Sequence, residues 1–306
     1  MKKLLQQLLL LLLIVAALAY ANLLVNEYLF DRYNHKLAPG TETVVCGASI
    51  SRNALNDSII PNCENISVAA RSAMDFFLVS KRILRDNPQV ERIITDYTIQ
   101  GLSGFRDYMF FHPKLAQSSF GRIYPLADYK HLSDYRLNTK LYIKSLLRHK
   151  LTPDITYWKN MIHQWLPSVK YEIPYIGYYE NRKGNDLDAK TLKEGLDYYF
   201  YFKGKPYPVG YNDLNYIDSI VVMTGNLGVE CVLFAGPIHP DALEVVPEHF
   251  MEAYKKGIDR FRKLDHVTIL EYTSVTLPDS CFANHNHMNY RGAEIISHMV
   301  KDTLNL

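Results

Sequence analysis

The chain has 306 residues, of which 48% are hydrophobic, and a formal net charge of +2. This length suits one large domain or two small ones, and the composition is that of a globular protein with a substantial core. The near-neutral charge argues against a nucleic-acid-binding protein, which usually shows a strong basic excess.

The N-terminal segment has the length and composition of a membrane-spanning helix. Lys2-Lys3 precede an apolar run from Leu8 to Val25, which as a helix would span roughly 27 Å. The lysines predict a cytoplasmic N-terminus, so the rest of the chain would lie outside the cytoplasm, in the periplasm or on the outer face of the membrane. A cleaved signal peptide is the alternative, because Ala19-Tyr20-Ala21 resembles a cleavage site. We expect an uncleaved anchor over residues 1–25, because the apolar run continues past that site.

After a polar connector at 26–42, residues 43–306 show alternating strand-like and helix-like segments. The expected strands are 43–46, 65–68, 92–97, 230–235 and 267–270, and the expected helices are 69–86, 212–228, 247–264 and a last one containing 293–304. We expect Asn212 and Asn289 to cap their helices and Gly228 to end one. The alternation predicts an α/β fold, a doubly wound parallel sheet with helices on both faces.

Residues from about 100 to 210 interrupt this alternation and are rich in aromatic side chains. The chain has 23 tyrosines, and many lie in this part, for example in 198–202. We interpret it as one helical insertion that forms a cap near the site. The aromatic residues indicate either amphipathic packing under a surface insertion or a wall that faces sugars.

The four cysteines do not predict a disulfide framework. An exported domain permits disulfides. However, Cys46 and Cys231 fall in expected core strands, where free buried thiols are common. We therefore expect no disulfide bridge among the four cysteines, which are Cys46, Cys63, Cys231 and Cys281.

Two short motifs bring a serine and a histidine to the same edge of the predicted sheet. The strand 43–46 runs into Gly47-Ala48-Ser49, and Asn284-His285-Asn286-His287 precedes the last helix. Gly47 lets the turn bend sharply. A serine hydroxyl becomes an effective nucleophile when a base lies within hydrogen-bond reach and backbone donors face the developing oxyanion. The pair therefore predicts the active site of a serine hydrolase or acyltransferase.

These motifs resemble those of the SGNH (GDSL-like) hydrolase and acyltransferase superfamily. That family has Gly-x-Ser after its first strand and Asp-x-x-His before a helix that begins Gly-Ala, as Gly292-Ala293 do here. The resemblance covers about 43–100 and 212–304. It implies a flavodoxin-like three-layer α/β/α fold.

The resemblance also implies a role for each matching residue. Ser49 would be the nucleophile and a first oxyanion donor through its amide, and His287 would be the general base. The backbone amide of Ala70 would stand in for the family's second donor. Where the family has Gly-x-Asn-Asp, this chain has residues 97–101, so that Gln100 or Thr98 would have to replace the third donor.

Asn284 stands where the family carries an aspartate. In a serine protease, exchanging this aspartate for asparagine costs about 10⁴ in rate, largely because the histidine adopts the wrong tautomer. The cost is smaller if the Asn284 carbonyl faces the ring N–H. Three alternatives follow: a slow Ser–His dyad, another carboxylate such as Asp279 in place of the acid, or an inactive site.

Arg52 and His239 complete the candidate pocket. Arg52 either binds an anionic substrate group or faces solvent, and His239 is expected to line the pocket. A zinc site of His239, His285 and His287 is an alternative, but no cysteine or carboxylate completes it with recognisable spacing. We expect neither a metal nor a cofactor.

The sequence thus favours a membrane-anchored serine esterase or O-acyltransferase that acts on an acylated cell-envelope glycan or a small ester. The glycan follows from the family resemblance and the tyrosine-rich insertion. One alternative is a catalytically inactive binding module of an envelope assembly, which Asn284 and the missing Gly-x-Asn-Asp motif favour. Another is an unrelated membrane-tethered α/β protein.

Overall fold

The computed structural model describes residues 2–33, 35–111, 126, 177–184, 187, 195 and 197–306. The chain divides into two compact units, one comprising Met1–His35 with Phe111–Pro174 and the other Lys36–Phe110 with Tyr175–Leu306. Most of the expected insertion at 100–210 lies outside the described residues, so the expected cap stays a prediction.

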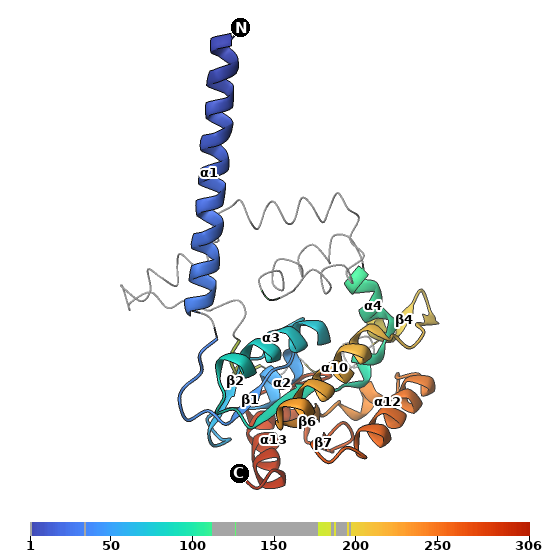
Figure 1. Cartoon of the computed structure of the whole chain (residues 1–306). Coiled ribbons are helices and arrows are strands. Elements are labelled where there is room, and N and C mark those ends of the chain that lie inside the picture. Colours follow the sequence, from blue (N-terminus) through green and yellow to red (C-terminus); the bar gives the residue numbers. More distant parts are fainter. Residues whose placement is uncertain are drawn as a thin grey trace. The chain divides into compact units, whose positions relative to one another are not determined.

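The described part of the first unit is essentially one long helix. Helix α1 spans Lys2–Tyr33 (Figure 1). Its segment Lys2–Val25 is long and apolar enough to cross a membrane, and none of that segment is buried. It is therefore a candidate membrane anchor or signal sequence. The helix continues to Tyr33, so the first part of the expected connector is helical.

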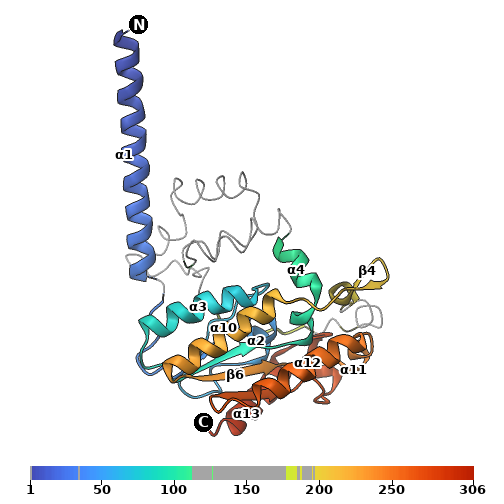
Figure 2. The same cartoon turned by 45° about the vertical axis from the view of Figure 1, so that its right-hand side comes forward.

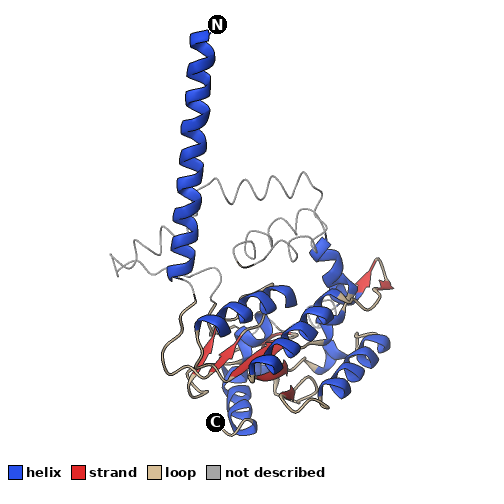
Figure 3. Cartoon of the chain, in the orientation of Figure 1, coloured by secondary structure: helices blue, strands red, loops and turns tan. Residues whose placement is uncertain are grey.

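The second unit is built on a five-stranded, wholly parallel sheet (Figure 3). Its strands are β1 (Thr43–Val45), β2 (Cys63–Asn65), β3 (Arg92–Asp96), β6 (Glu230–Ala235) and β7 (Val267–Glu271), arranged in the order β2-β1-β3-β6-β7. The chain moves outward from β1 to β2 and then returns to the other side of β1 to form β3. Such a reversal opens a crevice at the carboxyl ends of the two central strands, where ligands bind in doubly wound sheets.

Helices cover both faces of this sheet (Figure 2). Helices α3 (Ala73–Asp86) and α10 (Asn212–Leu227) lie side by side against β3 and β6. The opposite face packs on α2 (Ser49–Ala54) and α13 (Tyr290–Thr303), with which Val45, Ile94, Val232, Phe234 and Leu270 form one buried cluster. Because successive side chains of a strand point to opposite faces, the residues between these positions face α3 and α10.

The remaining elements connect and surround this framework. They are η1 (Ile99–Leu102), α4 (Gly104–Phe111), β4 (Tyr201–Phe202), β5 (Lys205–Pro206), α11 (Pro240–Leu243), α12 (Glu248–Phe261), η2 (Asp279–Cys281), β8 (Phe282–Asn284) and β9 (His287–Met288). The pairs β4–β5 and β8–β9 are short antiparallel hairpins. All four cysteines are free thiols, and Cys46 and Cys231 are fully buried.

Two of the three expected helix caps are present in the structure, and the third is not. Gly228 ends α10 in the left-handed conformation, with φ of 69°, as expected. Asn289 caps α13 by accepting hydrogen bonds from the amides of residues 291 and 292, also as expected. The expected cap by Asn212 is wrong. The carboxylate of Asp107, on α4, instead accepts from the amides of Tyr211 and Asn212.

The second strand lies earlier than expected, at Cys63–Asn65 instead of 65–68. The amide of Ser67 donates to the side-chain oxygen of Asn65, so the chain turns locally. The Asn65 side-chain nitrogen in turn donates to the carbonyls of Ser51 and Leu55 on α2 and its end. Asn65 therefore ends β2 and fixes the position of α2 beside that strand.

Candidate functional site

Ser49 is the first residue of α2, directly beyond the carboxyl end of β1. The turn before it is held by two neighbouring segments. The amide of Ala48 donates to Asp96 Oδ2 at the end of β3, at 2.6 Å, and the amide of Gly47 donates to Ser67 Oγ at 3.1 Å. These bonds fix the position of the serine at the crevice between β1 and β3.

Gly47 serves close packing rather than a sharp bend, because its φ lies outside the left-handed range. A Cβ atom here would lie 2.1 Å from Ser51 Oγ and 2.8 Å from Asp96 Cγ. Any side chain at this position would therefore force the side chain of Ser51 or Asp96, or the turn that carries Ser49, to move.

Gly47→Ala is expected to lower the free energy of unfolding by about 1–3 kcal/mol through overpacking. Chemical denaturation would measure the loss. Gly40→Ala is the matched control, since a Cβ atom there meets nothing within 4 Å. Equal stabilities of the two variants would show that the turn has room that the structure does not indicate.

His287 reaches Ser49 from the β8–β9 hairpin. Its Nε2 lies 2.7 Å from Ser49 Oγ, and its Nδ1 lies 2.9 Å from Asn284 Oδ1. The backbone amides of Asn286 and His287 also donate to Asn284 Oδ1, at 3.3 and 3.1 Å. These two amides require an acceptor, so the carbonyl oxygen of Asn284 faces the ring and Nδ1 carries the proton. Nε2 is then free to accept the serine proton, as a general base must.

The surroundings of His287 favour its neutral form. Burial lowers its pKa to about 3, and the positive charge of Arg182 and the neighbouring His285 act in the same direction, while Glu180 opposes them. Burial likewise lowers the pKa of His285 to about 4. A neutral imidazole is ready to accept a proton, but the imidazolium that forms is poorly stabilised.

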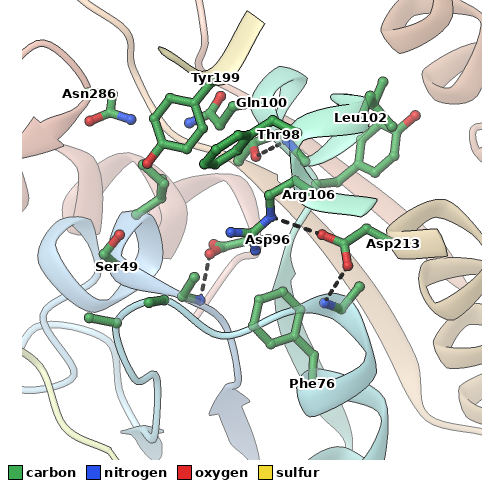
Figure 4. A pocket seen from close by; sticks show the side chains of 18 of the residues that line it. Ser49, Phe76, Asp96, Thr98, Gln100, Leu102, Arg106, Tyr199, Asp213 and Asn286 are labelled. Atoms are coloured by element: carbon green, nitrogen blue, oxygen red, sulfur yellow. Dashed lines mark hydrogen bonds and ion pairs between the residues drawn. The ribbon is translucent and has the colours of Figure 1, made fainter. Parts of the chain in front are cut away.

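A cavity of about 360 Å³ opens beside Ser49 (Figure 4). His287 also lines this cavity. Its walls come from the turns after β1 and β2 and from η1, α3, α4 and α10. Ala70 and Gln100, the expected oxyanion residues, both line it. Ala70 adopts a left-handed backbone with φ of 60°, a conformation that glycine takes without strain.

Arg52 and His239 lie outside the lining of this cavity. The Arg52 guanidinium stacks 4.4 Å from the centre of the Tyr178 ring, and its Nε lies 3.8 Å from Glu180. His239 Nε2 lies 3.2 Å from Asp279 Oδ1. Their placement in the pocket is therefore wrong.

The same contacts correct two alternatives from the sequence. Asp279 pairs with His239 and not with His287, so it does not replace the missing acid. The zinc alternative also fails, because both ring nitrogens of His287 are already engaged by Ser49 and Asn284. Within the described ranges, no three His, Cys, Asp or Glu side chains gather in a way that could hold a metal ion.

Several charged residues of the cavity were not singled out from the sequence. Arg106 Nε donates to Asp213 Oδ2 at 3.1 Å, and Arg106 Nη2 donates to the Arg71 carbonyl at 2.6 Å. Asp96 lies beside this pair (Figure 4), and burial raises its pKa to about 6. Asp96 follows a predicted strand at the ligand-binding edge, and that position was a usable signal. Arg182 also lines the cavity.

The chain matches no model of a known protein family and no curated protein.

Proposed function

We propose that this protein is a membrane-anchored, SGNH-like serine esterase or O-acyltransferase that acts on an acylated glycan of the cell envelope. The observation that carries the proposal is the line of three polar groups in which Asn284 holds Nδ1 of His287 and Nε2 of His287 meets the Ser49 hydroxyl at 2.7 Å. A base oriented by a third group beside a hydroxyl is the signature of an activated nucleophile.

The chemistry follows from this arrangement. Ser49 Oγ attacks the ester carbonyl carbon while His287 Nε2 takes the hydroxyl proton. His287 then gives that proton to the leaving alcohol oxygen as the carbon–oxygen bond breaks, and the acyl group remains on Ser49. Water, or the hydroxyl of an acceptor sugar, attacks the acyl-enzyme with His287 again as the base. The first route is hydrolysis and the second is transfer.

Donors for the oxyanion would come from the start of α2 and the cavity wall. The Ser49 amide belongs to the first turn of a helix, where backbone N–H groups point outward. Gln100 lines the same cavity. The family resemblance implies the Ser49 amide as one donor and either Gln100 or Thr98 as another.

Three features support the SGNH relationship. The strand order corresponds to 2-1-3-4-5, which is that of flavodoxin-like sheets. The serine follows the first strand and the histidine precedes the last helix. Ala70 adopts the backbone conformation suited to the glycine of that family. The candidate anchor α1 and its two lysines support a catalytic domain outside the cytoplasm.

An inactive binding module remains a second candidate, favoured by one observation. Asn284 supplies no charge to stabilise the imidazolium, and the pKa of His287 is only about 3. A module of this kind would keep the cavity and lose the reaction.

A fluorophosphonate probe separates the two candidates. The full-length protein in detergent is expected to be labelled, and Ser49→Ala is expected to abolish labelling, because the probe reacts only with an activated serine. Ser58→Ala is the matched control, since Ser58 is an exposed serine just beyond α2. Absence of labelling in wild-type protein that circular dichroism shows to be folded would support the binding module instead.

A further inference from the structure

The cavity beside Ser49 contains buried polar atoms that have no partner. Gln100 Oε1 and Asn286 Oδ1 are buried and accept no hydrogen bond. Both residues line the cavity and are at least nine-tenths buried, at 7% and 2% exposed. Buried polar groups in native proteins are nearly always paired, so a molecule in the cavity, either water or a ligand that displaces it, supplies the missing bonds.

These atoms indicate a ligand with hydroxyl groups. As placed, the carbonyl oxygens of Gln100 and Asn286 require a donor. If either amide were turned over, its NH₂ group would require an acceptor. A hydroxyl group satisfies both orientations, because it donates one hydrogen bond and accepts others.

The charges around the cavity indicate that this ligand is neutral. Among the described lining residues, Arg106 and Arg182 are cationic and Asp96 and Asp213 are anionic. Arg106 is already paired with Asp213. An ammonium group would meet the two arginines, and an anion would meet the unpaired oxygens, so neither is favoured over an uncharged hydroxyl.

An aromatic cluster forms another wall of the same cavity. The rings of Tyr198 and Tyr199 lie 3.9 Å apart between centroids, and Phe105 packs edge-on to each at 5.5 Å. The Ser103 hydroxyl donates to the Tyr199 carbonyl and ties this cluster to the end of η1. Aromatic rings offer a flat apolar surface, and tyrosine adds a polar tip.

We propose that this cavity binds the sugar part of the substrate, with Gln100 and Asn286 bonding its hydroxyl groups and the Tyr198–Tyr199 wall covering its apolar face. The use of this subsite in acyl chemistry rests on the proposed function, but sugar binding does not. The residues that we assign to glycan recognition therefore all belong to the described part of the second unit.

Binding is best tested without turnover, in full-length Ser49→Ala protein held in a detergent that has no sugar head group. The probes are the methyl glycosides of glucose, galactose and N-acetylglucosamine, observed by saturation-transfer difference NMR. Cyclohexanol, a ring with a single hydroxyl, and choline, a cation, serve as comparison ligands. At least one glycoside is expected to receive saturation and to bind more tightly than either comparison ligand.

Variants then test the assigned residues. Gln100→Met and Asn286→Leu, each added to Ser49→Ala, keep the side-chain volume and remove the hydrogen bond, so each is expected to weaken glycoside binding about tenfold. Met109→Leu is the matched control, a volume-conserving change in the same cavity, with Kd expected within about twofold. A thermal melt checks that each variant is folded.

The outcomes separate this inference from the proposed function. Hydrolysis of p-nitrophenyl acetate by the wild-type protein tests the proposed function and does not depend on sugar binding. If that ester is hydrolysed but no glycoside binds, or if choline binds best, the sugar subsite is wrong while the enzyme stands. If glycosides bind through Gln100 and Asn286 but no ester is hydrolysed, the subsite stands and the protein is the binding module.

Discussion

Replacing His287 with alanine is expected to lower kcat for p-nitrophenyl acetate by about 10³- to 10⁴-fold, because general-base catalysis contributes roughly that much. Nε2 of His287 is the group that meets the Ser49 hydroxyl at 2.7 Å. Steady-state kinetics at pH 8 would measure the loss. His298→Ala is the matched control, since His298 is an exposed histidine on α13 and is expected to leave kcat unchanged.

A double-variant comparison makes this prediction sharper. Residues that act as one catalytic unit are strongly non-additive. Ser49→Ala combined with His287→Ala is therefore expected to be no slower than Ser49→Ala alone. If the two losses multiplied, the hydroxyl and the imidazole would be acting independently, and the contact between them would have no catalytic meaning. If His287→Ala left kcat intact, the serine would have another base.

Strong local patterns predicted the framework of the second unit. The strand at 230–235 and the glycine that ends α10 have the expected positions, because a continuous apolar run and a left-handed cap are encoded by adjacent residues. The cap of α10 was missed because its acceptor, Asp107, lies more than 100 residues earlier in the chain. The second strand was misplaced because the side chain of Asn65 ends it locally.

The contacts of the site likewise fall into those that the sequence predicted and those that it did not. Ser49 and His287 are 238 residues apart, and the predicted sheet topology together with the family resemblance placed them at the same edge of the sheet. The tautomer-fixing contact of Asn284 follows from the short hairpin that holds both residues. The Arg106–Asp213 pair depends on how α4 packs against α10, which no local pattern encodes. For the same reason Arg52 and His239 were wrongly placed in the pocket.

Asn284→Asp is expected to make the enzyme faster, in contrast to most changes at an active site. The asparagine already selects the correct tautomer through its carbonyl oxygen, so the aspartate adds only the missing charge. An adjacent carboxylate favours a charged partner by about 1–3 pKa units, and each unit corresponds to about tenfold. We therefore expect kcat at pH 8 to rise about 10- to 1,000-fold.

Asn286→Asp is the matched control for this gain. It places the same charge on the same loop, but its side chain does not contact Nδ1 of His287, and the residue contributes only its backbone amide to Asn284. We expect no increase in kcat from this variant. An equal increase in both would attribute the effect to the overall charge of the cavity, and no increase in either would favour the binding module.

The pH dependence gives Asn284→Asp a second and independent readout. With the pKa of His287 at about 3, the wild-type base stays deprotonated, and its rate should persist, down to about pH 4. The added carboxylate raises that pKa, so the acid limb of the rate profile moves up by the same 1–3 units, and the gain in rate shrinks as the pH falls. The same difference in pKa makes the stability of the folded protein depend on pH. The unfolded chain takes up the histidine proton near pH 6.5 and the folded protein only near pH 3, so the free energy of unfolding falls as the pH drops from 6.5 towards 3. In Asn284→Asp this loss is smaller, because the folded protein then binds the proton at a higher pH. A faster variant without a displaced acid limb would mean that the carboxylate acts on some group other than His287.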